Sequence, residues 1–161
     1  MRAYSRRIAA PTGPARLGLE TIAVPDSAPI ELDLRMESVT EGVYVSGTVH
    51  APLSGECARC LDAVTDVVDV ELSELFAYPD SVTDETTDAD EVPRVVDELV
   101  DLEQTVRDAV VLALPLAPLC RDDCAGLCPG CGEKWADLAP DHGHETLDPR
   151  WAALKERLSA D

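Results

Sequence analysis

Apolar and polar residues alternate in three segments of the N-terminal half of the chain. The first runs from Ile30 to Met36, the second from Val43 to Val49, and the third from Val68 to Leu72, leading into Phe76. A period of two is typical of strands that bury one face and expose the other. The sequence therefore predicts a small antiparallel sheet, whose buried face a helix can cover.

A helix is predicted after these strands, beginning near Asp101. This aspartate suits an N-cap position, and Gln104 follows three residues later, as in a capping box. Pro115 ends the helix, because proline cannot continue the hydrogen-bond ladder. Apolar residues at helical spacing would form its core-facing stripe: Leu102, Val106, Ala109, Val110 and Ala113.

A second helix is predicted at the end of the chain. Asp148 suits its N-cap and Pro149 its first helical position. Trp151, Leu154 and Leu158 would then share one face and pack in a core.

Charge changes the picture of possible partners. The 161 residues include 13 Lys and Arg against 32 Asp and Glu, for a net charge of −19, and aromatic residues are only 4%. Such a chain repels phosphate and offers few rings for base stacking, so tight direct binding to nucleic acid is disfavoured. Basic proteins, such as ribosomal proteins, are the expected partners.

Residues 80–91 contain six acidic side chains and no basic one. We interpret this segment as a solvated, mobile loop, with a docking site for a basic partner as the alternative. Residues 1–16 carry four arginines (Arg2, Arg6, Arg7 and Arg16) and are expected to form a flexible basic arm.

No targeting or membrane segment is visible. Residues 1–18 lack a continuous apolar stretch, and the longest apolar run, Ala109 to Leu114, is too short to span a bilayer. A cytoplasmic location is therefore expected. In that compartment the six cysteines favour metal ligation over disulfides.

The cysteines occur in three pairs. Two are Cys-x-x-Cys turns, Cys57/Cys60 and Cys128/Cys131, and the third is Cys120/Cys124. Such turns bind zinc because backbone N–H groups point at the thiolates, and Gly132 tolerates the left-handed conformation that follows the second cysteine. A redox pair would need a helix start in a βαβ unit, and an iron–sulfur cluster fits this placement of proline and glycine less well.

The ligand partition has two alternatives. In the first, one zinc is held by Cys57, Cys60, Cys120 and Cys124, and a second by Cys128, Cys131, His142 and His144. In the other, a single zinc ribbon pairs Cys57 and Cys60 with Cys128 and Cys131, and both histidines near the C-terminus lie free on the surface. His50 is expected to be solvated. One or two zinc ions are therefore predicted.

Catalysis has little support in the sequence. Sites that use only cysteine are closed, so they stabilise structure and leave no coordination position for a substrate. The chain also lacks a glycine-rich phosphate loop and a nucleophile elbow. The predicted organisation is an α+β protein: a basic arm (1–16), a small antiparallel sheet packed with one or two helices (17–119), and a zinc-binding segment with a C-terminal helix (120–161).

Several motifs resemble the YceD family, the large ribosomal RNA subunit accumulation proteins, over roughly Leu17 to Leu158. They are Cys57-Ala-Arg-Cys60-Leu61 after a strand, the acidic loop, Leu114-Pro-Leu-Ala-Pro-Leu-Cys120, Gly126-Leu-Cys-Pro-Gly-Cys-Gly132, and Asp148-Pro-Arg-Trp151. The resemblance implies a small bacterial or plastid protein needed for normal levels of large-subunit ribosomal RNA. Family members often carry Cys-x-Cys where this chain has His142-Gly-His144, and imidazole can replace thiolate on zinc.

Two functions follow as hypotheses. The first is a non-enzymatic, zinc-stabilised factor in large ribosomal subunit biogenesis, acting through basic ribosomal proteins or the pre-ribosomal large subunit. The alternative is a zinc-ribbon interaction adaptor unrelated to ribosomes. Direct contact with RNA stays open.

Overall fold

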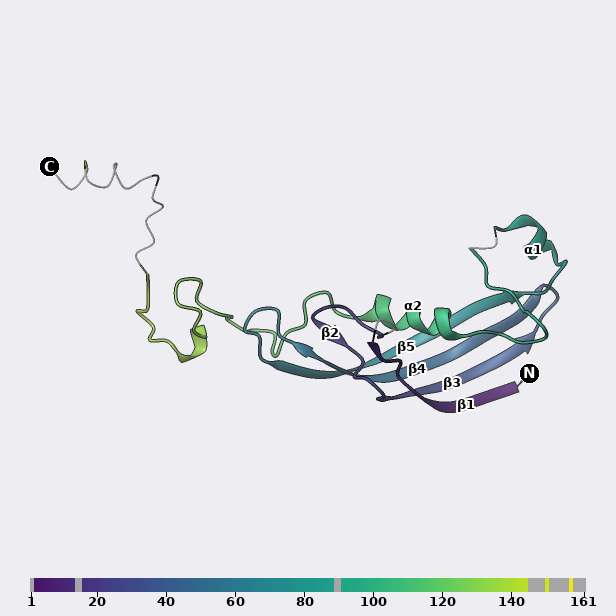
Figure 1. Cartoon of the computed structure of the whole chain (residues 1–161), viewed down its shortest axis with the longest axis horizontal. Helices are drawn as coiled ribbons and strands as arrows, with labels where there is room; N and C mark the ends of the chain where they lie inside the picture. Colours follow the sequence, from purple (N-terminus) through teal and green to yellow (C-terminus); the bar gives the residue numbers. More distant parts are fainter. Residues whose placement is uncertain (1, 14–15, 89–90, 145–149, 151–156, 158–161) are drawn as a thin grey trace.

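The computed structural model describes residues 2–13, 16–88, 91–144, 150 and 157. Its main element is a five-stranded antiparallel sheet (Figure 1), made of β1 (Arg2–Ala9), β2 (Ile22–Ala23), β3 (Pro29–Ser38), β4 (Gly42–Glu56) and β5 (Ala63–Ala77). β5 pairs with one side of β4 along its whole length, and β3 and the short β2 share the other side. β1 pairs with the outer side of β3.

All three segments of alternating polarity form strands, which confirms that part of the sequence analysis. In β3, Ile30 and Leu34 are buried, while Glu31 and Asp33 are exposed on the other face. The strands are longer than the alternation shows: β4 and β5 have 15 residues each and form one long hairpin.

Helix α2 (Glu103–Ala113) lies across one face of the sheet and packs on β5 (Figure 1). Val106, Val110 and Leu114 are buried at successive helical turns, so the predicted stripe forms, with Leu114 in place of the exposed Ala113. These residues join the buried faces of the strands in one core that contains none of the cysteines. Phe76 is its largest fully buried side chain.

The prediction of a flexible basic arm over residues 1–16 is wrong. Arg2–Ala9 form β1, and every residue from Arg2 to Ala9 has a partner in β3. Arg7 pairs with Glu31 across the two strands. Most side chains of this strand are exposed, so its sequence does not show the alternation of apolar and polar residues that predicts a strand. The strand forms through backbone pairing with β3.

The acidic segment 80–91 is not entirely a loop within the residues described. It contains the short helix α1 (Val82–Thr86), which begins where the Ser81 hydroxyl accepts a hydrogen bond from the Asp84 N–H at 3.1 Å. Arg94 pairs with Asp84 and also donates to the carbonyl oxygen of Thr87 at 3.1 Å. These contacts hold α1 and the residues after it in place, although the acidic composition of this segment predicts a mobile loop.

The expected capping box at the start of α2 does not form. The helix begins after Leu102, and Asp101 accepts from the Glu103 N–H at 2.9 Å. The Gln104 side chain turns along the helix and donates to Asp108. The predicted second helix, from Asp148 to Leu158, lies outside the described residues, apart from Arg150 and Arg157.

Between α2 and His144 the described residues have little regular structure, apart from the short 3-10 helix η2 (Trp135–Asp137). The part of this segment up to His144 extends beyond the end of the sheet that carries the β4–β5 turn (Figure 1). Among the described residues, no helix combines the length and apolar character that a membrane span requires.

Candidate metal centres

The turn between β4 and β5 holds Cys57 and Cys60. It is closed by two backbone hydrogen bonds, from the Cys57 N–H to the Asp62 carbonyl at 2.7 Å and from the Leu61 N–H to the Cys57 carbonyl at 2.9 Å. Leu61 has a φ of 62°, in the left-handed region, and its side chain is exposed. The long hairpin therefore ends in a tight loop that presents two sulfur atoms.

The turn at Cys128 and Cys131 repeats this design. The Cys128 N–H donates to the Glu133 carbonyl at 2.7 Å, and the Gly132 N–H donates to the Cys128 carbonyl at 2.8 Å. Gly132 has a φ of 76° and occupies the position that Leu61 takes in the first turn. Two segments that are far apart in the sequence thus form the same Cys-x-x-Cys loop.

Cys120 and Cys124 meet the first turn. The four ligand atoms of Cys57, Cys60, Cys120 and Cys124 all lie within 4.8 Å of one another. Two Sγ–Sγ distances are 3.8 Å (Cys57–Cys124) and 3.6 Å (Cys60–Cys120). Four sulfurs at zinc-binding distance form a tetrahedron with edges of about 3.8 Å, so the spacing suits one tetrahedral ion.

The second group contains Cys128, Cys131, His142 and His144, again with ligand atoms within 4.8 Å of one another. His142 Nε2 lies 3.5 Å from both sulfurs and 3.0 Å from His144 Nε2. The ring of Trp135, in η2, meets the His142 ring edge to face at 5.7 Å between centroids. This group could hold a second metal ion.

Backbone N–H donors lower the pKa values of the thiols, whereas burial and neighbouring thiols raise them. Burial opposes the ionisation of Cys57, but the backbone N–H groups of Cys120, Arg59 and Cys60 outweigh it and lower the Cys57 pKa to about 6. At Cys60 a backbone hydrogen bond from Asp62 favours the thiolate, yet burial and the neighbouring thiols raise the pKa to about 12. One thiolate forms readily, and a cation would relieve the repulsion that opposes the others.

Burial likewise opposes the ionisation of Cys128 in the second group. Backbone hydrogen bonds from Cys131 and Gly130 outweigh it, and the pKa of Cys128 falls below its ordinary value. The first sulfur of each Cys-x-x-Cys loop is therefore the one that the backbone prepares as a thiolate.

Arg59, between the first two cysteines, connects the segments. Its guanidinium donates to the Cys124 carbonyl at 2.8 Å, and its own carbonyl accepts from the Leu127 N–H at 3.1 Å. Gly126 has a φ of 79°, and a Cβ there would lie 3.0 Å from the Arg59 carbonyl oxygen. A side chain at position 126 would therefore interfere with this contact.

The structure brings the eight predicted ligand residues together in two groups, as the first partition predicts. Cys128 and Cys131 belong to the group of His142 and His144, so the single-ribbon pairing with Cys57 and Cys60 is not formed. The roles of Arg59 and Leu61 were missed. No motif marks an arginine that binds a distant carbonyl, and leucine rarely adopts a left-handed conformation.

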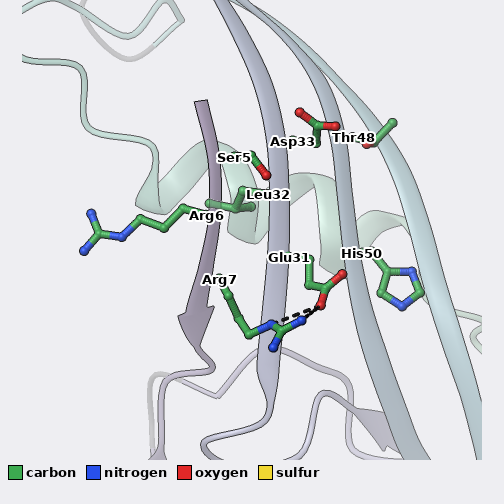
Figure 2. Close-up of a pocket in the computed structure, with 8 residues that line it drawn as sticks. All are labelled: Ser5, Arg6, Arg7, Glu31, Leu32, Asp33, Thr48 and His50. Carbon is green, nitrogen blue, oxygen red and sulfur yellow. Dashed lines mark hydrogen bonds and ion pairs between the residues drawn. The ribbon is translucent and has the colours of Figure 1, made fainter. Parts of the chain in front are cut away.

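His50 lies apart from both groups, on the polar face of the sheet. Its Nδ1 is 2.7 Å from Asp69 Oδ1, and the side chain is partly exposed. Figure 2 shows this shallow pocket, where Arg7 pairs with Glu31 and Arg6 points away from that pair. Arg7 and His50 both pair with acidic residues of neighbouring strands, so the described residues of this pocket do not form an unpaired basic cluster.

The fold and the site together define a class of protein: a small antiparallel sheet with two candidate metal-binding groups. One group has four cysteines and includes the tip of the β4–β5 hairpin, and the other has two cysteines and two histidines. The model of the family described as "Large ribosomal RNA subunit accumulation protein YceD" matches residues 45–156. The chain belongs to the YceD family.

Two relatives illustrate the range of similarity. "Uncharacterized protein Rv2926c" of Mycobacterium tuberculosis is 62% identical over 148 residues, which cover 92% of this chain and 71% of the relative. "Uncharacterized protein YlbN" of Bacillus subtilis is 28% identical over 130 residues, which cover 80% of this chain and 72% of the relative. No solved structure matches this chain.

Proposed function

We propose that each of the two groups binds one Zn²⁺, through Cys57, Cys60, Cys120 and Cys124 in the first and Cys128, Cys131, His142 and His144 in the second. Thiolate and imidazole ligands favour zinc over the harder ions Mg²⁺ and Ca²⁺. The spacing of the sulfur atoms supports this assignment, because it matches the edge of a zinc tetrahedron.

Both zinc sites are structural in this proposal, and the protein is not an enzyme. Four protein ligands complete a tetrahedron and leave no position for water or a substrate. Each ion instead holds together segments that have few apolar contacts. The first connects the tip of the β4–β5 hairpin to the chain after α2, and the second folds the segment from Cys128 to His144.

The protein acts, in this proposal, as a factor in the biogenesis of the large ribosomal subunit and supports the accumulation of its RNA. The match of residues 45–156 to the YceD family carries the proposal, because the family is described by that role. With a net charge of −19, the chain would act through basic ribosomal proteins of the pre-ribosomal large subunit, in the cytoplasm, and not by gripping the RNA backbone.

Deletion of the gene in its own organism tests the role. Sucrose-gradient sedimentation should then show fewer large subunits than small ones, with less large-subunit RNA. The wild-type gene should restore both, and a Cys57→Ser/Cys60→Ser variant should restore less. Normal subunit profiles and RNA levels after deletion would contradict the ribosomal role and favour the alternative, an interaction adaptor unrelated to ribosomes.

A further inference from the structure

The outer side of β5 has no strand beside it among the described residues. In the described part of the chain, β5 pairs with β4 through residues 63–77, and a segment returns to its outer side only at Ala77. There the Ala77 N–H donates to the Pro93 carbonyl at 2.9 Å, and the Ala77 carbonyl accepts from the Val95 N–H at 2.9 Å. Both backbone groups of Ala77 therefore point away from β4.

The backbone N–H and C=O groups of successive residues in an antiparallel strand point to opposite sides. Those of every second residue before Ala77 therefore also point away from β4. The Val67 N–H is occupied, because it donates to Asp66 at 2.8 Å. Within the described part of the chain, no hydrogen-bond partner lies on the outer side of the next four such residues: Asp69, Glu71, Ser73 and Leu75. An edge of this kind is a template for one more strand.

A groove with a volume of about 440 Å³ runs between this edge and α2. Ala109 and Leu112 of α2 supply apolar surface, and Leu112 is 85% exposed. Among the described residues that line it there is no lysine, arginine or histidine, while five carboxylates are present: Glu71, Glu74, Glu91, Asp101 and Asp108. The groove thus combines open backbone groups, an exposed leucine and negative charge.

We propose that the β5 edge beside α2 binds an extended basic segment of a partner protein, which adds to the sheet as a further strand. Successive side chains of an added strand point to opposite faces. Lysines or arginines on one face would approach Asp69 and Glu71, and those on the other would approach Glu74 and Asp108 of the groove.

A second copy of this chain is a poor occupant, because its own edge carries the same negative charges. The chemistry of the occupant follows from the groove. That such segments come from ribosomal proteins rests on the proposed function, which this inference deepens.

A synthetic peptide tests the surface directly. It should be about eight residues long, to match the free edge at roughly 3.3 Å per residue, with blocked ends and lysine alternating with valine and threonine. Fluorescence anisotropy with the full zinc-loaded chain should show saturable binding that weakens with salt. A peptide of equal charge with proline at alternate positions should bind at least about tenfold more weakly, because it lacks donors for the edge.

Variants of the protein separate backbone pairing from charge. Ser73→Pro removes one outward N–H and should weaken binding about three- to tenfold. Ser73→Ala is its matched control, since it removes only the hydroxyl that contacts Tyr44 at 2.7 Å. Glu71→Gln/Glu74→Gln/Asp108→Asn should weaken binding about tenfold, and the equally charged control Glu20→Gln/Asp26→Asn/Asp33→Asn should leave it within about twofold.

Amide exchange followed by NMR locates the peptide. Binding should newly protect Asp69, Glu71, Ser73 and Leu75, while the residues between them already pair with β4. Equal binding of the proline peptide, absence of binding, or self-association of the chain through this edge would each overturn the proposal. The outcome is separate from the ribosomal test: normal subunits after gene deletion would leave peptide binding unchanged, and a failed peptide experiment would leave the sedimentation result unchanged.

Discussion

Lys134 Nζ lies 2.5 Å from Asp62 Oδ1, so an ion pair joins the two candidate metal centres. Asp62 follows Cys60 in the first loop, and Lys134 follows the second loop. The hydrogen bond from Lys134 holds the pKa of Asp62 below its usual value of 3.8. Beside it, Lys134 and Leu127 form a backbone bridge. The two centres therefore contact each other through groups that are not ligands.

Lys134→Met should loosen the second centre from the first without removing a ligand. We expect faster amide exchange at Leu127 and Trp135, which bond to Arg59 and Gly126, and an unchanged metal content. Lys134→Arg keeps the charge and should retain most of the protection. Equal exchange in wild type and Lys134→Met would show that this ion pair is not needed for docking.

Native mass spectrometry should find one zinc ion for each of the two groups, hence two per chain. A Cys128→Ser/Cys131→Ser variant should keep one zinc and a folded sheet, because the first group uses none of the altered residues. His142→Ala should weaken only the second ion. A wild-type chain with a single zinc would contradict the two-site proposal.

Gly130→Ala should weaken the second centre selectively. A Cβ at Gly130 would lie 2.2 Å from His144 Cδ2, so the imidazole must move away from its position among the other donors. Gly143→Ala is the matched control, because nothing lies within 4 Å of a Cβ there. Competition with a zinc indicator should show one weakened site in Gly130→Ala and none in Gly143→Ala.

Chelation should affect the two ends of the molecule unequally. The sheet and α2 share a core without cysteines, whereas Cys57, Cys60 and Cys124 dominate a separate small cluster with Val64. Zinc binding contributes on the order of 10 kcal/mol to the folding of small zinc-finger units, and the cysteine segments have little else. Hydrogen exchange after metal removal should rise from Cys120 to His144 and change little in β3 and β4. A uniform rise throughout the sheet would contradict this.

Acid should release the contact between Arg94 and α1. The Arg94 guanidinium, helped by the Asp80 N–H, lowers the pKa of Asp84 below 3.8. A lowered pKa means that the contribution to stability is complete above the ordinary value and disappears as pH falls through the folded value. Amides of Thr83–Thr87 should exchange faster in Asp84→Asn than in wild type near neutral pH, with the difference shrinking as the pH falls below 3.8. The neighbouring Glu85→Gln should show no such difference at neutral or acidic pH.

The sequence predicted the elements that bury an apolar face. β3 follows the alternation of Ile30 and its neighbours, and α2 follows the stripe through Val106 and Val110. β1 was missed because its residues are mostly exposed, and only pairing with β3 reveals it. Long-range backbone pairing of this kind leaves no local pattern.

The length of β4 could not be predicted from the local sequence either, because a proline such as Pro52 is rarely found in the interior of a strand. Pro52 faces Val67 of β5, and their backbone groups do not bond to each other, since those of Val67 point outward. On the other side of β4, pairing with β3 ends at His50 and pairing with β2 begins at Ser54. The proline thus occupies the one gap in the ladder, where no N–H is needed.

Ligand residues were predictable because cysteine and histidine are rare and their spacing is restrictive. The sequence left two possible ways of dividing the cysteines and histidines between metal ions. It could not decide between them, because the answer depends on how residues after α2 fold back to the hairpin. Arg59 contacts Cys124 and Leu127 where these residues meet the hairpin, and neither contact is recognisable from the sequence.

The order of residues along the chain also sets an order of events during synthesis. The last strand, β5, ends at Ala77 and α2 ends at Ala113, so all five strands and this helix are synthesised before Cys120. Domains fold from the N-terminus as they leave the ribosome. The sheet can therefore form before the other two ligands that Cys57 and Cys60 require have been synthesised. The four-sulfur group can close only after Cys124 has emerged. Closure of this group therefore comes after every strand of the sheet has been synthesised.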